Sequence, residues 1–436
     1  MPELPLITAV LAVPGFSWRH DQAATTSSQP GSSTLSIGLV LDDERVAWGV
    51  CPFAPGSPFD IDTAGNTIRQ RVAPALQREP LARFRKLAAK IDALTETVTV
   101  HETLPRPERD NQAAKFSRRD LFSGRLWSPD PASESAPPTR EITAKQPIDA
   151  ALRYGVSQAL LAAVAMTKKK TLAETVAAEY ALPIPLSAVA THAWVRPPAG
   201  DDATAVSGLL SRQIASLGYT IAGNNDKAPS DVSGESLQQQ VRRLQTQIAA
   251  AAPAYQPVIH LDLGGEFGRL FDDNPGKILG ALYGLEQAAS PYPLRVVDPA
   301  VMDSLPAQIE ILRQLKEYLR LRRMRLQLVA GAWVESGDDA VAFIQAGAAH
   351  AIQFDAPRLG SLHHTIEAIL ACREQSVTCL LASADDGRSA QILAHVALAT
   401  RPDVIIAPAS AGALALIHDE MARTLAWLTR NSRSTE

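Results

Sequence analysis

The segment AIQFDAPRLGSLHHTIEAILACREQSVTCLLAS, residues 351–383, contains one complete copy of the pattern that decides the fold. A short apolar run, AIQFDAP, is followed by a helical pattern at 359–375 and then by a second apolar run, VTCLLAS. Nearly continuous apolar runs are typical of strands buried on both faces of a parallel sheet. Asp355 stands at the end of the first run, which raises the question of what this carboxylate does there.

The same strand and helix unit recurs from residue 186 onward. Eight apolar runs each precede a helical pattern, and eight such units predict an α/β protein with a closed (β/α)8 barrel. An open, doubly wound parallel sheet is the alternative. The predicted strands cover 186–193, 218–224, 258–265, 293–299, 325–331, 351–357, 377–383 and 403–409.

The chain before the barrel has a different pattern. LITAVLAV, from residue 6, and TLSIGLVLDDERVAWGV, from residue 34, are expected to pair as two strands of a hairpin. Residues 104–147 are richer in Pro, Ser, Arg and Asp than the rest of the chain, and a helical pattern follows them. This shift in composition predicts a domain boundary near residue 147.

Composition limits the class of protein. With 436 residues, of which 46% are hydrophobic, the chain can bury a large core. A net charge of -4 and 5% aromatic residues argue against nucleic-acid binding, and no apolar run approaches the roughly 20 residues that span a bilayer. Cys51, Cys372 and Cys379 lack metal-ligand spacing and are odd in number, which favours a reducing, cytoplasmic location.

Polar side chains gather at the predicted strand ends, where barrel enzymes place their chemistry. Carboxylates and imidazoles there can hold a divalent cation or share acid and base roles. A carboxylate at a strand end also commonly caps the next helix or pairs with an arginine, here Arg358 or Arg388. The candidate rim residues are His192, His260, Asp262, Asp298, Gln353, Asp355 and Ser383.

Six sequence blocks occur in the order found in a known family. They are RYGVSQALLAAVA (153–165), HLDLGGEFG (260–268), LRVVDP (294–299), LVAGAW (328–333), IQFDAPRLGS (352–361) and DGRSAQ (386–391). These blocks resemble methylaspartate ammonia-lyase, a family of the enolase superfamily. The resemblance implies a homodimer that eliminates ammonia from 3-methylaspartate with one Mg²⁺ ion. It also implies an α+β capping domain on the barrel. With the shift in composition, this gives a capping domain at 1–104, an insertion or linker at 105–146 that is longer than the connection expected in the family, and the barrel domain at 147–436.

The metal site that the resemblance implies is incomplete in this sequence. Three barrel carboxylates hold Mg²⁺ in the family. The first falls on Asp262, the second on Val297 with Asp298 beside it, and the third on Gly331. Asp262 and Asp298 are therefore the candidate ligands of a divalent metal.

The implied bases have also changed. A lysine at the end of the sixth strand falls on Asp355, and the histidine that faces it falls near Tyr219 or Thr220. Asp355 reverses the charge of the base. Together with His192 and His260, it is the candidate catalytic group if a new acid/base pair has replaced the old one.

The substrate contacts are partly kept. Gln353 matches a family glutamine, while a Thr-Cys pair becomes Ala382 and Ser383. Gln353, Ser383 and Arg388 are the candidate ligand-binding residues, for a small carboxylate. Family glycines become Leu380 and Leu381, whose bulk narrows the pocket if they point inward.

These changes predict the loss of the ancestral reaction. A general base contributes on the order of 10²- to 10⁴-fold to a rate, and a metal stabilises the enolate by several kcal/mol more. We expect a divergent homologue that acts as a non-catalytic binding or assembly module. The alternative is an enzyme like a carbon-nitrogen lyase, with a rewired acid/base or metal site, acting on a small amino or carboxylic acid.

FSRRDLFSGRLW, residues 116–127 of the predicted insertion, combines basic and apolar side chains between polar flanks. It predicts a linear motif that docks a protein partner. The alternative is a loop packed across the chain's own capping domain. The candidate contacts are Arg118, Arg119, Leu121, Phe122 and Trp127.

Overall fold

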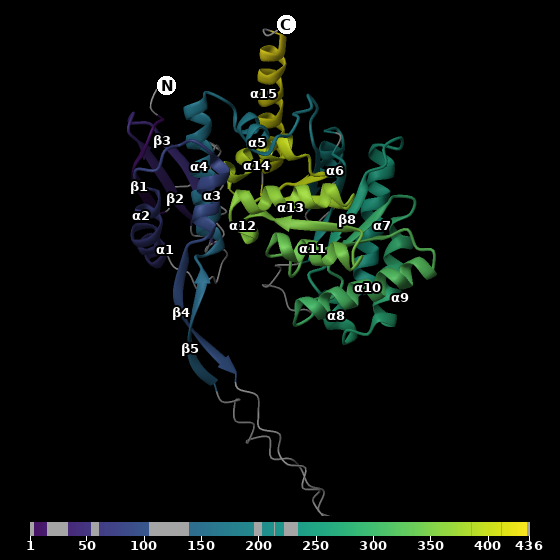
Figure 1. Cartoon of the computed structure of the whole chain (residues 1–436). Helices are drawn as coiled ribbons and strands as arrows, with labels where there is room; N and C mark the ends of the chain where they lie inside the picture. Colours follow the sequence, from purple (N-terminus) through teal and green to yellow (C-terminus); the bar gives the residue numbers. More distant parts are fainter. Residues whose placement is uncertain are drawn as a thin grey trace, which may run out of the picture. The chain divides into compact units, whose positions relative to one another are not determined.

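The computed structural model describes residues 4–14, 34–53, 61–103, 139–195, 203–212, 214–221, 234–384, 386–410 and 412–433. The chain divides into two compact units (Figure 1). One unit contains residues 1–93 and 149–436, and the other contains residues 94–148. The three-part division at residues 104 and 146 stays a prediction.

Eight parallel strands form a closed barrel, which confirms the predicted fold and excludes the open sheet. The barrel closes where β13 pairs with β6, with Ile406 opposite His192. The strands are β6 (Ala190–Trp194), β7 (Ser216–Thr220), β8 (Val258–Asp262), β9 (Leu294–Val297), β10 (Gln327–Ala330), β11 (Ala351–Asp355), β12 (Thr378–Ala382) and β13 (Val404–Ile406).

Each strand is followed by a helix, as predicted. Two short helices, α8 (Glu266–Phe271) and α12 (Ala356–Leu359), are additional and lie directly after β8 and β11. The helices that follow the strands are α6 (Ala203–Leu210), α7 (Gly234–Ala251), α9 (Pro275–Ala289), α10 (Leu305–Leu321), α11 (Gly337–Gln345), α13 (Leu362–Glu374), α14 (Gly387–Thr400) and α15 (Ala413–Arg433).

Short polar side chains start many of these helices. Ser304, Ser336 and Ser361 each accept a hydrogen bond from the backbone N–H three residues on, and Asp386 does the same from Ser389. Such N-caps satisfy backbone donors that the first helical turn leaves unpaired. They determine the residue at which each loop after a strand ends and the next helix begins.

The inside of the barrel is largely apolar. One buried cluster contains Val297, Val329, Ala351, Leu380, Val404 and Ile406, and Trp194 and Ala382 pack against it. Leu380 therefore points inward, whereas Leu381, its neighbour in the strand, points to the opposite face. Two positions that the resemblance makes polar or small, Val297 and Leu380, belong to this core.

A small antiparallel sheet lies N-terminal to the barrel, with strands β1 (Ile7–Pro14), β2 (Thr34–Leu41) and β3 (Val46–Pro52) in that order. The pairing of β1 with β2 is as predicted. The run at 34–50, predicted as one strand, is two strands, because the chain turns at 42–45 with Glu44 at a φ of 67°. Four helical segments follow: α1 (Ile61–Thr67), a π-helical turn (Ile68–Val72), α2 (Ala73–Leu76) and α3 (Phe84–Asp92).

Helix α4 (Ala150–Lys168) joins this sheet to the barrel and is followed by α5 (Leu172–Tyr180). It packs so closely on β3 that a Cβ on Gly49 would lie 2.0 Å from the Gly155 carbonyl oxygen. Gln158 of α4 accepts from the Val50 N–H and donates to the Val50 carbonyl, both at 3.2 Å. The same amide donates to Ser389 Oγ of α14 at 3.1 Å. One buried side chain thus connects β3, α4 and α14.

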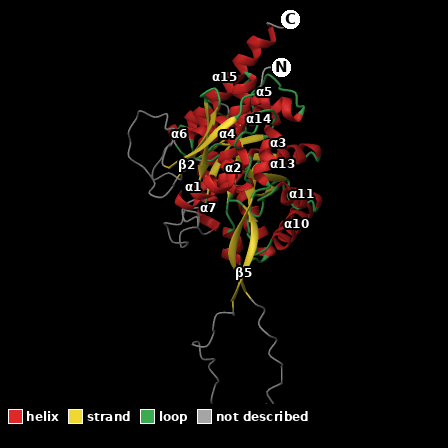
Figure 2. Cartoon of the chain, turned by 60° about the vertical axis from the view of Figure 1, so that its left-hand side comes forward, coloured by secondary structure: helices red, strands yellow, loops and turns green. Residues whose placement is uncertain are grey.

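The second unit is a two-stranded antiparallel ribbon of β4 (Thr95–Thr103) and β5 (Thr139–Pro147), visible in Figure 2. Strand β5 includes residues 139–146, the last part of the predicted insertion at 105–146. The proposed docking residues Arg118, Arg119, Leu121, Phe122 and Trp127 lie outside the described residues. Among the helices that the structure describes, none has the length and apolar character needed to cross a membrane.

Candidate functional site at the barrel mouth

Three aspartates stand at the carboxyl end of the barrel. Asp262 ends β8, Asp355 ends β11 and Asp298 directly follows β9. Strand pairing places Asp262 opposite Val297 and Asp355 opposite Ala382, so all three belong to the same end of the barrel. This is the end at which (β/α)8 barrels place their active sites.

Asp298 is held by backbone donors of the next loop. Its Oδ1 accepts from the Gly331 N–H at 3.1 Å, and its Oδ2 accepts from the Ala332 N–H at 2.6 Å. Its φ of 42° is a strained conformation for a residue other than glycine. Burial raises the pKa of Asp298 to about 7, against the lowering effect of these two N–H groups. The carboxylate therefore joins the β9 and β10 loops.

Asp262 lies within electrostatic reach of Asp298, since its charge contributes to the raised pKa of Asp298. Asp262 Oδ1 accepts from the Gly264 N–H at 3.2 Å. Burial raises the pKa of Asp262 to about 6, and that hydrogen bond partly offsets the effect. The two carboxylates thus form a pair, each already bonded to backbone.

Asp355 has neither of the two structural roles expected for a carboxylate at a strand end. It makes no side-chain hydrogen bond to the start of α12, and Arg358 pairs with Glu335 at 2.9 Å instead. Burial raises the pKa of Asp355 to about 6, while the positive charge of Arg358 opposes the rise. Within the described residues its carboxylate accepts no hydrogen bond. Asp355 is therefore the carboxylate of the mouth that remains available to a ligand.

His192 and His260 lie below the mouth, in the barrel core. Both are almost fully buried, and their ring centroids are 4.8 Å apart. Trp194, two residues closer to the mouth on the same face of β6, packs on both rings at 4.4 and 5.6 Å. Burial lowers the pKa of His260 to about 3 and that of His192 well below its usual value. Both imidazoles are therefore neutral, with an indole between them and the mouth.

Gln353 lies next to these histidines. Its Oε1 and the Nε2 atoms of His192 and His260 are buried and have no hydrogen-bond partner in the part of the chain that the structure describes, while His192 Nδ1 contacts Ser216 Oγ at 3.0 Å. Ser383 is nearer the surface, and its hydroxyl donates to the Ala384 carbonyl at 3.2 Å. Sequence reasoning missed Trp194, although the period-two alternation of β6 places it on the inner face with His192.

Arg388 does not join the mouth residues in any hydrogen bond or ion pair that the described residues make. It is the second residue of α14 and reaches the Trp48 carbonyl of β3 at 3.5 Å. The structure therefore separates the predicted ligand-binding residues into two places: Gln353 inside the barrel, and Arg388 between the small sheet and the outer helices.

Comparison with known proteins identifies the family. The C-terminal model of methylaspartate ammonia-lyase matches residues 197–430, and its N-terminal model matches residues 132–181. The chain belongs to the methylaspartate ammonia-lyase family. Methylaspartate ammonia-lyase 2 of Carboxydothermus hydrogenoformans is 35% identical over 299 residues, covering 67% of this chain and 71% of the relative. The Clostridium tetanomorphum enzyme is 28% identical over 421 residues, or 93% of this chain and 89% of that one.

Solved structures of the family share the fold. The Citrobacter amalonaticus lyase, which contains (2S,3S)-3-methylaspartic acid, has a TM-score of 0.73 at 24% identity and covers 97% of this chain and 100% of its own. The magnesium complex of the Clostridium tetanomorphum enzyme has a TM-score of 0.71 at 22% identity, and the match covers 98% of this chain and 100% of that one. The barrel with its N-terminal cap is thus the enolase-superfamily fold.

The residues of this mouth do not fit the magnesium site that the family resemblance implies. The second ligand position, Val297, is buried in the apolar cluster. At the third position, a Cβ on Gly331 would lie 2.9 Å from Asp298 Oδ2, so Asp298 occupies the space where a side chain at 331 would begin. No group of three His, Cys, Asp or Glu side chains able to hold a metal occurs among the described residues.

Proposed function

We propose that this chain no longer eliminates ammonia from methylaspartate and acts as a non-catalytic binding or assembly module of its family. The observation that carries the proposal is the apolar inner wall of the barrel. Val297 stands where the resemblance places a metal carboxylate, and it packs in one buried cluster with Leu380. Trp194 packs against the same cluster, so the wall beneath the three aspartates of the mouth is apolar at positions where a cation bound to a dicarboxylate requires further polar groups.

The carboxylate at the base position supports the same conclusion. Elimination from methylaspartate requires removal of a weakly acidic proton from carbon next to a carboxylate, and the developing negative charge needs a nearby cation. Asp355 carries a negative charge instead of a lysine, so it repels a dicarboxylate. Arg358, the nearest compensating cation, already pairs with Glu335.

The test is turnover by the purified full-length chain with 3-methylaspartate and Mg²⁺, followed by the ultraviolet absorbance of the unsaturated diacid product. The Citrobacter amalonaticus lyase, assayed beside it, shows that the conditions support the reaction. We expect product formation at the rate of the buffer blank. Magnesium-dependent turnover approaching that of the relative would overturn the proposal.

A rewired lyase is the second candidate, and one observation favours it. Burial raises the pKa of Asp262 and Asp355 to about 6 and that of Asp298 to about 7. Carboxyl groups that titrate near neutral pH are suited to general acid/base catalysis. The test is ammonia release from a panel of small amino acids. Release that is lost in Asp355→Asn but kept in Asp303→Asn, a control on the exposed loop after β9, would favour this candidate. Release from none of these amino acids would exclude it for that panel.

The remaining assignments are proposals of the same kind. A homodimer is supported by family membership, and its mass in solution can be measured by light scattering. A cytoplasmic location is supported by three buried cysteines that are free thiols. A docking role for residues 105–146 is tested by deleting 106–140 and comparing the partners that co-purify with each form.

A further inference from the structure

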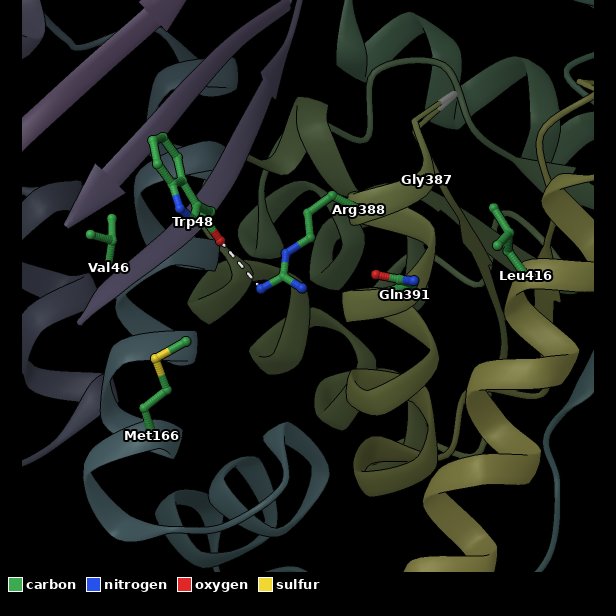
Figure 3. Close-up of a pocket in the computed structure, with 7 residues that line it drawn as sticks. All are labelled: Val46, Trp48, Met166, Gly387, Arg388, Gln391 and Leu416. Atoms are coloured by element: carbon green, nitrogen blue, oxygen red, sulfur yellow. Dashed lines mark hydrogen bonds between the residues drawn. The ribbon is translucent and has the colours of Figure 1, made fainter. Parts of the chain in front are cut away.

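A cavity of about 330 Å³ lies between the small N-terminal sheet and the barrel's outer helices (Figure 3). Its size is at the lower end of the range typical for small-molecule sites. Most of its wall is apolar, and the polar groups converge from α14. The lining side chains are Val46 and Trp48 of β3, Met166 of α4, Arg388 and Gln391 of α14, and Leu416 of α15.

Arg388 is the cation of this cavity. Among the described residues its buried Nε has no hydrogen-bond partner, while Nη2 donates to the Trp48 carbonyl at 3.5 Å (Figure 3). No carboxylate lies within ion-pair distance of it among the described residues. A guanidinium offers five donors in a planar fork, and removing such a charge from water is unfavourable unless an anion compensates.

The nearby carboxylates already have partners. Burial lowers the pKa of the Arg388 guanidinium group, and the negative charges of Glu420 and Asp386 act on it in the opposite direction. Glu420 binds Arg423 at 2.6 Å and His395 at 3.0 Å, and Asp386 accepts from the Ser389 N–H at 2.7 Å. Their combined negative charge disfavours a doubly charged ligand, so a single carboxylate suits the site better than a phosphate dianion.

The walls of the cavity are held at a fixed spacing. Gln158 bonds to both backbone groups of Val50 in β3 and to Ser389, the residue after Arg388 in α14. Because this amide is fully buried, the strand that carries Trp48 and the helix that carries Arg388 are connected through one side chain. A site already formed in this way loses little conformational entropy when a ligand binds.

We propose that this cavity binds a small monocarboxylate with an apolar body. The carboxylate accepts hydrogen bonds from the guanidinium group of Arg388, which favours bidentate geometry with carboxylates. The Gln391 amide lies one helical turn further on and adds a polar contact, while Met166 and Leu416 enclose the apolar part. The site is separate from the barrel mouth, so it goes beyond the proposed loss of turnover and stands whether or not that loss is correct.

Calorimetric titration of the full-length chain with phenylacetate tests the proposal. We expect one molecule bound per chain, and binding at least about tenfold weaker for the neutral analogue phenylacetamide and for inorganic phosphate. Arg388→Gln should weaken phenylacetate binding at least about tenfold. Arg313→Gln is the matched control, because Arg313 lies on the exposed face of α10 in an ion pair with Glu310, and it should bind as the parent does.

A second variant keeps the test decisive if Arg388→Gln fails to fold. Leu416→Trp fills the cavity and leaves Arg388 in place, so it should abolish binding while the free energy of unfolding stays near that of the parent. The proposal is overturned if phenylacetate shows no saturable heat with the parent chain. It is also overturned if the affinity survives both variants, or if phenylacetamide or phosphate binds as tightly.

Discussion

The barrel mouth and the Arg388 cavity are opposite in charge. The mouth contains three carboxylates whose pKa values burial raises, and its nearest cation, Arg358, is paired with Glu335. The cavity contains a partly buried guanidinium that forms no ion pair with a carboxylate of the described residues, although Asp386 and Glu420 lie within electrostatic reach. We therefore expect an anionic ligand to be disfavoured at the mouth, where the family resemblance implies substrate binding, and favoured at the cavity. The contrast is the basis of the two proposals, that the ancestral reaction is lost at the mouth and that a small monocarboxylate binds at Arg388.

Replacing Trp194 tests whether the mouth is part of the core. Trp194→Ala removes the contacts of the indole with His192 and His260, so we expect a loss of about 2 to 3 kcal/mol in the free energy of unfolding, measured with urea. Trp427→Ala, on an exposed face of α15, should change it by less than about 0.5 kcal/mol. Equal effects would mean that Trp194 is not a core residue, and the mouth would then be open to ligands.

Replacing Asp298 tests whether its carboxylate serves to connect the β9 and β10 loops or to bind a cation. Asp298→Ala leaves the N–H groups of Gly331 and Ala332 without their acceptor, which should cost about 2 kcal/mol of stability without any metal present. Asp303→Ala, on the exposed loop that follows, is the control. A variant as stable as the parent but weaker in Mg²⁺ binding would contradict the structural role.

Replacing Asp355 examines the cost of its buried charge. Its pKa is raised to about 6 from 3.8, so the folded state binds a proton that the unfolded state does not between these values. Stability is therefore present at low pH and lost as pH rises through the folded pKa. Asp355→Asn should stabilise the chain by about 1 to 2 kcal/mol at pH 7 and by little at pH 4. Destabilisation at pH 7 would reveal a cationic partner at the mouth.

The two core histidines predict the opposite dependence on pH. His260 has its pKa lowered to about 3 from 6.5, so below pH 6.5 the unfolded state binds a proton that the folded state does not. Stability is then lost as pH falls, by about 1.4 kcal/mol per pH unit. His260→Gln should remove the contribution of His260 to that slope and leave the contribution of His192, which urea unfolding at several pH values measures. A slope unchanged by the substitution would mean that the imidazole reaches water.

How much the sequence reveals differs between the fold and the site. The eight strand and helix units could be predicted because apolar runs and helical periodicity are local. The turn at 42–45 was missed because it contains no glycine at its positive-φ position, Glu44, although Asp42 and Asp43 are residues common in turns. The Asp298 bonds were missed because they depend on the backbone of another loop. The Arg388 cavity depends on Trp48, which is 340 residues away in the chain, and no sequence pattern reports that contact.

A crystal structure of the full-length chain grown with Mg²⁺ and 3-methylaspartate tests the loss of the ancestral site most directly. We expect Asp298 to accept hydrogen bonds from the N–H groups of Gly331 and Ala332, with neither an ion nor an amino acid bound at the mouth. A magnesium ion coordinated by Asp262 and Asp298, with 3-methylaspartate beside Asp355, would contradict it.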